Sequence, residues 1–249
     1  MGRVLEYLTE KLHRGPLHMT LIDPDKRGGP AAAKVAAAAV ALGSDAIMLG
    51  GSTGISPEKM AETARGVKAA VSVPVIIFPE SPASITPAAD AIYFMSLLNS
   101  RSVDHVIRMQ ALSALEIQRI GLEPLSLGYI IIAPGMRVGE VGQADPVPRE
   151  AFQLAQSYAL AAELFGMDLV YLEAGSGAPS PVPVDMVRSV RRVLRIPLIV
   201  GGGIRSANEA AGLLAAGAQI LVTGTVTEEQ GIGTAFEGIL AEVRRARGE

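Results

Sequence analysis

Residues 197–225, PLIVGGGIRSANEAAGLLAAGAQILVTGT, follow a pattern of strand, helix and strand. We predict strands over 197–200 and 220–222 and a helix over 207–216. Solid apolar strands, with no alternation of polar residues, are typical of a parallel sheet buried on both faces. Each strand runs into a glycine-rich loop, Gly201-Gly202-Gly203 after the first and Gly224-Thr225 after the second. The stretch is therefore predicted to be one βαβ unit of an α/β protein.

The same alternation extends over the rest of the chain. We predict further strands over 19–22, 45–49, 73–78, 91–95, 126–133 and 169–172, and helices over 30–42, 57–70, 103–120, 149–165 and 183–194, with a last helix ending near Arg245. About eight strands and seven helices in 249 residues predict a single domain, 1–249, folded as a (β/α)8 TIM barrel. A doubly wound open sheet is the alternative, but the first strand lacks the GxGxxG loop typical of it.

Two segments interrupt the alternation. Residues 79–89 contain three prolines and no helical pattern, although a regular barrel has its third helix there. We therefore predict a modified barrel in which a Pro-rich segment replaces the third helix. Residues 136–146 are predicted to be a long polar loop.

Composition excludes several classes of protein. The chain is 49% hydrophobic and 19% charged, which excludes intrinsic disorder. It has no cysteine, so disulfide scaffolds, thiolate zinc sites and cysteine nucleophiles are excluded. A net charge of −3 argues against nucleic acid as a partner and against an anionic membrane surface. The N-terminus lacks the apolar run of a signal peptide. We expect a cytoplasmic protein without stable membrane insertion.

The two late glycine loops predict a phosphate site. In (β/α)8 barrels the loops after strands 7 and 8 often bind phosphate, because glycine lets backbone N–H groups approach an anion closely. Gly202, Gly203, Gly224 and Thr225 are the candidate residues. The alternative is that these glycines only form tight turns.

The sixth predicted strand ends in a candidate catalytic carboxylate. Tyr171 and Glu173 lie two residues apart, so their side chains face the same side of the strand. If that side is the barrel interior, Glu173 can accept a hydrogen bond or a proton at the mouth of the barrel. Ser176, in the Gly175-Ser176-Gly177 segment, could add a hydroxyl. The alternative is a structural ion pair between Glu173 and a nearby arginine or lysine.

The first strand ends in Asp23-Pro24-Asp25, a candidate Mg²⁺ site. Mg²⁺ is commonly bound by one or two protein oxygens together with substrate phosphates, so Asp23 would suffice. Ser52, after the second strand, is an adjacent candidate oxygen. The alternative is an Asp-Pro turn without a metal.

Taken together, these motifs resemble the geranylgeranylglyceryl phosphate synthase family. They are Leu21-Ile22-Asp23-Pro24-Asp25-Lys26, Gly50-Gly51-Ser52-Thr53-Gly54, Tyr171-Leu172-Glu173-Ala174-Gly175-Ser176-Gly177, Gly201-Gly202-Gly203-Ile204 and Gly224-Thr225. The resemblance covers nearly the whole chain. It implies a modified barrel without the third helix, and homo-oligomers that are dimers or hexamers.

The resemblance also implies a reaction and its residues. Family members transfer a geranylgeranyl group from geranylgeranyl diphosphate to the 3-hydroxyl of sn-glycerol 1-phosphate, with Mg²⁺ as cofactor. Asp23 and Ser52 would then bind the metal, and Glu173 would orient or deprotonate the hydroxyl. The residues expected to bind glycerol 1-phosphate are Tyr171, Leu172, Glu173, Ala174, Gly175, Ser176, Gly177, Gly202, Gly203, Gly224 and Thr225.

Other functions stay open at this point. Leu21 stands where bacterial relatives, which make heptaprenylglyceryl phosphate, tend to carry lysine; this favours the archaeal type without fixing the prenyl length. A sugar-phosphate isomerase, a lyase and a non-catalytic phospho-ligand binder are the remaining alternatives. An apolar groove for the prenyl tail could involve Tyr93, Phe94, Met95, Leu97 and Leu98. We expect surface or capping roles for His13, His18 and His105, and a solvent-exposed face for Arg244, Arg245 and Arg247.

Overall fold

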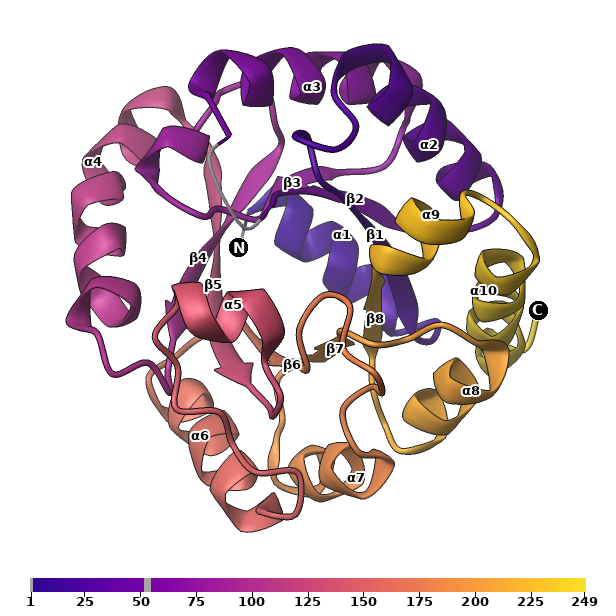
Figure 1. Cartoon of the computed structure of the whole chain (residues 1–249). Coiled ribbons are helices and arrows are strands. Elements are labelled where there is room, and N and C mark those ends of the chain that lie inside the picture. Colours follow the sequence, from indigo (N-terminus) through magenta and orange to yellow (C-terminus); the bar gives the residue numbers. More distant parts are fainter. Residues whose placement is uncertain (1, 52–54) are drawn as a thin grey trace.

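The barrel fold is confirmed by a computed structural model, which describes residues 2–51 and 55–249. Within these residues, eight parallel strands close in chain order, with β8 pairing back to β1 (Figure 1). The open-sheet alternative is therefore wrong. The strands are β1 Leu17–Ile22, β2 Ala46–Leu49, β3 Val75–Ile77, β4 Ala91–Leu97, β5 Glu123–Ile131, β6 Leu169–Glu173, β7 Leu198–Gly201 and β8 Ile220–Thr223.

A ring of helices surrounds the strands. These are α2 Gly29–Ala41, α3 Pro57–Ala70, η2 Asp104–Arg108 with α4 Met109–Ile120, α6 Phe152–Leu164, α7 Val184–Val193, α8 Ala207–Ala215 and α10 Thr234–Arg247. The segment between β3 and β4 contains a short 3-10 turn, Pro82–Ser84. No helix among the described residues is long and apolar enough to cross a membrane.

Two short helices differ from the prediction: one lies in the predicted polar loop, and the other is separate from α10, where a single last helix was predicted. α5, Met136–Val141, occupies the start of the predicted polar loop 136–146. α9, Thr225–Gln230, precedes α10 and is separated from it by Gly231, which has φ 68°. Each is only six residues long, so neither produces a readable hydrophobic period.

The barrel interior is filled by alternate strand residues. Met19, Tyr93, Leu127 and Ile199 belong to one buried cluster inside the barrel, whereas the residues between them pack against the surrounding helices. An N-terminal helix that we did not predict, α1 Arg3–Leu12, lies across the centre of the ring in Figure 1. Its Val4 and Leu8, one helical turn apart, join the same cluster, so α1 closes the bottom of the barrel.

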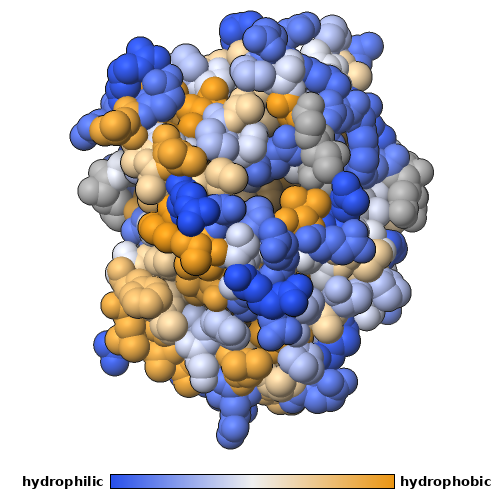
Figure 2. Space-filling model, turned by 60° about the vertical axis from the view of Figure 1, so that its left-hand side comes forward, coloured by the Kyte–Doolittle hydropathy of each residue, from blue (hydrophilic) through white to orange (hydrophobic). Residues whose placement is uncertain are grey.

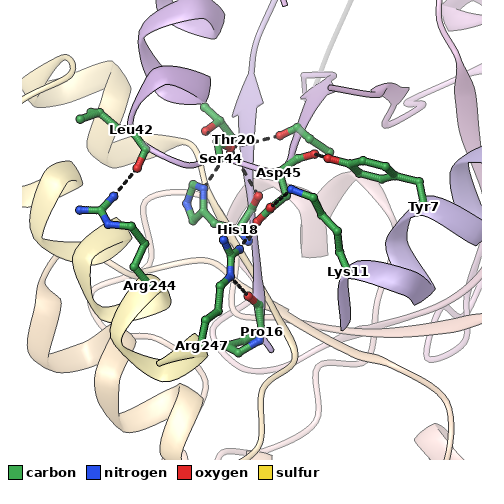
Figure 3. A network of polar contacts seen from close by, with 11 residues as sticks. Tyr7, Lys11, Pro16, His18, Thr20, Leu42, Ser44, Asp45, Arg244 and Arg247 are labelled. Atoms are coloured by element: carbon green, nitrogen blue, oxygen red, sulfur yellow. Dashed lines mark hydrogen bonds and ion pairs between the residues drawn. The ribbon is translucent and has the colours of Figure 1, made fainter. Parts of the chain in front are cut away.

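A buried carboxylate ties the two ends of the chain to the barrel (Figure 3). The Asp45 side chain is 2% exposed and accepts hydrogen bonds from Lys11 Nζ of α1 (2.7 Å), from Arg247 Nη2 of α10 and from the His18 backbone N–H. Arg244 of α10 donates to the Leu42 carbonyl. The prediction of a solvent-exposed face is therefore wrong for Arg244 and Arg247, because their long side chains reach back to the barrel.

The surface or capping role expected for His18 is also wrong. Its side chain is fully buried between β1 and α10, with the Phe236 ring at 5.4 Å. Its Nδ1 lies 3.1 Å from Ser44 Oγ and its Nε2 lies 2.9 Å from Thr223 Oγ1. Burial lowers the pKa of His18 to about 3, because the charged ring loses its hydration. The imidazole is thus a neutral packing residue with two hydroxyl partners.

Candidate active site

The carboxyl ends of the strands surround a cavity of about 890 Å³ that is open to solvent. We call it the mouth cavity. It contains Asp23 from the end of β1, Glu173 from the end of β6 and Phe78 after β3. Its other lining residues are Leu21, Lys26, Gly50, Gly51, Pro79, Glu80, Met95, Leu97, His105, Tyr129, Val138, Val141, Gly142, Tyr171, Ser176 and Glu228. His105, expected to have a surface or capping role, lies here instead.

The two glycine loops border a smaller cavity of about 350 Å³, the phosphate-loop cavity. Gly202, Gly203, Gly224 and Thr225 line it together with Glu173 and Ser176. The backbone N–H groups of Gly202 and Gly203 have no hydrogen-bond partner among the described residues. No lysine or arginine lines this cavity in the part of the chain that is described. An anion here would therefore be bound by backbone N–H groups and hydroxyls.

Glycine is required at position 202. Gly202 has φ 80°, a left-handed conformation that side chains rarely adopt. A Cβ there would lie 2.3 Å from Glu173 Oε1 and 2.6 Å from the Gly175 nitrogen. The loop after β7 therefore approaches the loop after β6 so closely that only hydrogen fits between them.

Hydroxyls join the loop after β8 to the loop after β6. Thr225, the first residue of α9, accepts a hydrogen bond from the Gly177 N–H on its Oγ1 (3.1 Å). Ser176 Oγ lies 3.1 Å from the same oxygen. The predicted residues Ser176, Gly177 and Thr225 are thus brought together across 48 residues of sequence or more.

Two predicted binding residues are turned away from both cavities. Leu172 and Ala174 pack into the core between the barrel and the helices, because alternate strand residues face opposite sides. The Ala174 backbone is also occupied: its N–H donates to the Gly201 carbonyl, and its carbonyl accepts from the Gly135 N–H. Gly175 acts through its N–H, which donates to Glu173 Oε1 at 2.7 Å.

Glu173 is held as an acceptor in a largely dehydrated position. It is 7% exposed and accepts hydrogen bonds from the Tyr171 and Tyr129 hydroxyls as well as from Gly175. Burial raises the pKa of Glu173 above its usual value of 4.5, and these three donors partly offset that shift. A carboxylate with a raised pKa accepts a proton more readily than an exposed one.

An aromatic cluster lies next to Glu173. The ring of Phe78 packs edge to face against three tyrosines, with centroid distances of 5.4 Å to Tyr129, 6.1 Å to Tyr93 and 6.2 Å to Tyr171. Sequence reasoning placed Tyr171 in the glycerol phosphate site and Tyr93 among the candidate groove residues, and it named neither Phe78 nor Tyr129 as a site residue. The sequence carries no local signal for Tyr129, which reaches Glu173 because the register of β5 and β6 pairs it directly with Tyr171. The negative faces of such rings can stabilise a cationic carbon.

The first strand presents one carboxylate to the mouth cavity. Asp23 Oδ1 accepts from the Asp25 N–H at 2.9 Å, which is the predicted Asp-Pro turn, and its Oδ2 lies 3.9 Å from Lys26 Nζ. Ser52, the second predicted metal ligand, lies outside the described residues. Among those that are described, no group of three or more acidic or histidine side chains could hold a metal. One carboxylate fits Mg²⁺ bound mostly through phosphate oxygens and water.

A third cavity of about 570 Å³ extends the mouth cavity sideways between the 79–85 segment and α4. The two cavities share Pro79, Glu80, Met95, Leu97 and His105. Tyr93 and Phe94 line this side cavity, so four of the five candidate groove residues border it or the mouth. Leu98 does not; it packs against the outer core.

A closed parallel barrel with its site at the carboxyl ends of the strands defines this chain as a (β/α)8 barrel of the kind that acts on small ligands at its mouth. Which family it represents follows from comparison with known sequences. The chain belongs to the PcrB family, which it matches over residues 7–244.

Named relatives agree with this assignment. The geranylgeranylglyceryl phosphate synthase of Thermococcus gammatolerans is 50% identical over 231 residues, covering 93% of this chain and 92% of the relative. That of Pyrococcus furiosus is 47% identical over 245 residues, covering 98% of both. The crystal structure of (S)-3-O-geranylgeranylglyceryl phosphate synthase from Thermoplasma acidophilum with its substrate sn-glycerol-1-phosphate matches with a TM-score of 0.95 and 43% identity, covering 98% of this chain and 100% of that one.

Proposed function

We propose that this protein is a geranylgeranylglyceryl phosphate synthase. It joins the geranylgeranyl group of geranylgeranyl diphosphate to the 3-hydroxyl of sn-glycerol 1-phosphate and releases diphosphate. The observation that carries the proposal is that three cavities adjoin. The phosphate-loop cavity and the mouth cavity share Glu173 and Ser176, and the side cavity and the mouth cavity share Pro79 and Met95. Asp23 lines the mouth cavity between them. This order matches an acceptor phosphate, a reaction centre and a prenyl tail.

Each end of the site has a defined task. Backbone N–H groups of Gly202 and Gly203 bind the acceptor phosphate, which orients the glycerol toward Glu173. The hydroxyl oxygen forms a bond to C1 of the prenyl chain as the bond from C1 to the diphosphate oxygen breaks. Glu173 takes the hydroxyl proton on its carboxylate, and Tyr129 and Tyr171 hold that carboxylate in place.

Asp23, and Ser52 by resemblance, would hold Mg²⁺. The metal neutralises charge on the leaving diphosphate when it is bound. Phe78, Tyr129 and Tyr171 present aromatic rings to the mouth cavity, where positive charge develops on the allylic carbon.

The proposal is tested by incubating the protein with sn-glycerol 1-phosphate and prenyl diphosphates from C15 to C35, with Mg²⁺ or with chelator, and detecting products by mass spectrometry. A Mg²⁺-dependent C20 ether is the expected product. A longer ether would indicate a heptaprenylglyceryl phosphate synthase instead. Folded protein that binds glycerol phosphate and makes no ether with any donor would refute the prenyltransferase.

Gly202→Ala is expected to weaken binding of sn-glycerol 1-phosphate by about 5- to 150-fold. The added Cβ must displace Glu173 or Gly175, and a left-handed non-glycine residue costs about 1–3 kcal/mol. Isothermal titration calorimetry measures the change. Gly212→Ala is the matched control, because its Cβ would meet only Val184 Cγ2 at an ordinary 3.4 Å. Equal effects of both substitutions would contradict the requirement for glycine at 202.

We also propose that the protein is a homo-oligomer, a dimer or hexamer, assembled through the face formed by η2, α4 and α6. Figure 2 shows hydrophobic residues gathered on the α4 side of the molecule. Monomeric proteins rarely expose large apolar patches, and a net charge of −3 disfavours an anionic membrane as the partner. Sedimentation that shows only monomer would contradict this proposal. The exposed apolar residues of this face are Val103, Ile107, Leu112, Leu115, Leu154, Leu160, Leu164 and Phe165.

A further inference from the structure

Lys26 lies at the edge of the mouth cavity between carboxylates of two different elements. Its Nζ is 2.7 Å from Glu228 Oε2, on α9, and 3.9 Å from Asp23 Oδ2, directly after β1. All three residues line the mouth cavity. The Lys26 side chain is 55% exposed, so its ion pair with Glu228 is a weak contact that water screens.

A neighbouring residue already fastens α9 to the loop after β1. Arg27 Nη2 donates to the Thr227 carbonyl at 2.8 Å and to the Glu228 carbonyl at 3.1 Å. These two bonds hold the α9 backbone and do not involve the Lys26 side chain. The α9 backbone is therefore held to this loop by a residue other than Lys26.

The charges around the mouth cavity are unbalanced. Its described lining residues include four carboxylates, on Asp23, Glu80, Glu173 and Glu228. Lys26 is the one lysine or arginine among those same residues. A diphosphate entering this cavity adds several negative charges, and lysine is a compact charge on a flexible stem that can follow such a ligand.

We propose that Lys26 is a diphosphate-binding residue, which Glu228 holds until the prenyl donor enters. When the donor binds, Lys26 Nζ leaves Glu228 Oε2 and donates to a diphosphate oxygen beside Asp23. This inference rests on the proposed function, since it takes the ligand to be a prenyl diphosphate.

Two substitutions with opposite expected effects test the proposal. Binding of inorganic diphosphate to the full chain is measured by calorimetry, with Mg²⁺ and with chelator. Lys26→Met is expected to weaken binding by about 10- to 100-fold, the value of one charge-assisted hydrogen bond. Glu228→Gln is expected to strengthen it, because the neutral amide holds Lys26 less tightly than the carboxylate does and does not repel the ligand. Binding of sn-glycerol 1-phosphate should stay unchanged in both variants, and the KM for the prenyl donor should follow the diphosphate affinity.

A purely structural role of the Lys26–Glu228 ion pair would give a different result. If Lys26 and Glu228 only fastened α9, both substitutions would weaken both ligands and lower the melting temperature together, which would overturn the proposal. Equal diphosphate affinities of the wild type and the Lys26→Met variant would also overturn it. Arg27→Gln is the control for loosening α9 and should lower thermal stability. A wild type that binds diphosphate through Lys26 but makes no ether would refute the proposed reaction alone.

Discussion

Glu173→Gln is expected to lower kcat by about 10²- to 10⁴-fold, the usual contribution of a general base. The amide keeps the shape of the side chain and can still accept a hydrogen bond from Gly175 N–H, but it cannot take a proton from the acceptor hydroxyl. Steady-state kinetics with saturating substrates measures the loss. Full turnover in this variant would show that Glu173 is not the base.

The same substitution is expected to raise the melting temperature at neutral pH. Because the folded pKa of Glu173 lies above 4.5, the folded chain binds its proton more tightly than the unfolded chain does. Between 4.5 and the folded pKa, the contribution of Glu173 to stability therefore falls as pH rises. The advantage of Glu173→Gln should be largest above that pKa and shrink toward pH 4.5. A melting temperature below wild type at pH 8 would contradict this account.

Asp45→Asn is expected to be the most destabilising substitution that leaves the reaction intact. It leaves the Arg247 guanidinium, whose side chain is 12% exposed, without its carboxylate, and breaking a buried pair in this way costs about 3–5 kcal/mol. For a domain of this size, that lowers the melting temperature by roughly 6–20 °C. Calorimetry measures the shift, and kcat should be unchanged where the variant is folded, because Asp45 lies at the amino end of β2.

Two controls separate the buried pair from ordinary surface charges. Lys11→Met removes the partner that is 37% exposed, so its effect should be about 1 kcal/mol or less. Glu116→Gln removes an ion pair with Arg119 on the surface of α4 and should leave the melting temperature unchanged. If Asp45→Asn were as mild as these two, the network of Figure 3 would not stabilise the barrel.

The predicted elements were most accurate where the local pattern was strong. The helix predicted over 57–70 coincides with α3, where Pro57 follows Ser56, whose side chain caps the Lys59 N–H. The helix predicted over 149–165 begins only at Phe152. The N-terminal helix was missed because Val4 and Leu8 are too few to reveal a hydrophobic face before the barrel that receives them is known.

The candidate site likewise contains some residues that local sequence patterns predicted and others that they did not. Glu173, Gly202, Gly203 and Thr225 were predicted as site residues from their positions at strand ends, and they line one cavity because parallel strands bring those ends together. The sequence analysis did not name Tyr129, Lys26 or Glu228 as candidate site residues, although all three line the mouth cavity. The hydroxyl of Tyr129 reaches Glu173 only because β5 and β6 pair in register, which no local pattern specifies.

The sequence alone determined that this protein is a parallel barrel with glycine loops and a carboxylate at its mouth, because strand periodicity and turn chemistry act over a few residues. The tertiary structure decided which side chains meet. Lys26 and Glu228 are 202 residues apart, and so are Asp45 and Arg247. Such pairs depend on closure of the barrel, which places the last strand and helix beside the first, and this closure is a property of the whole chain rather than of any segment.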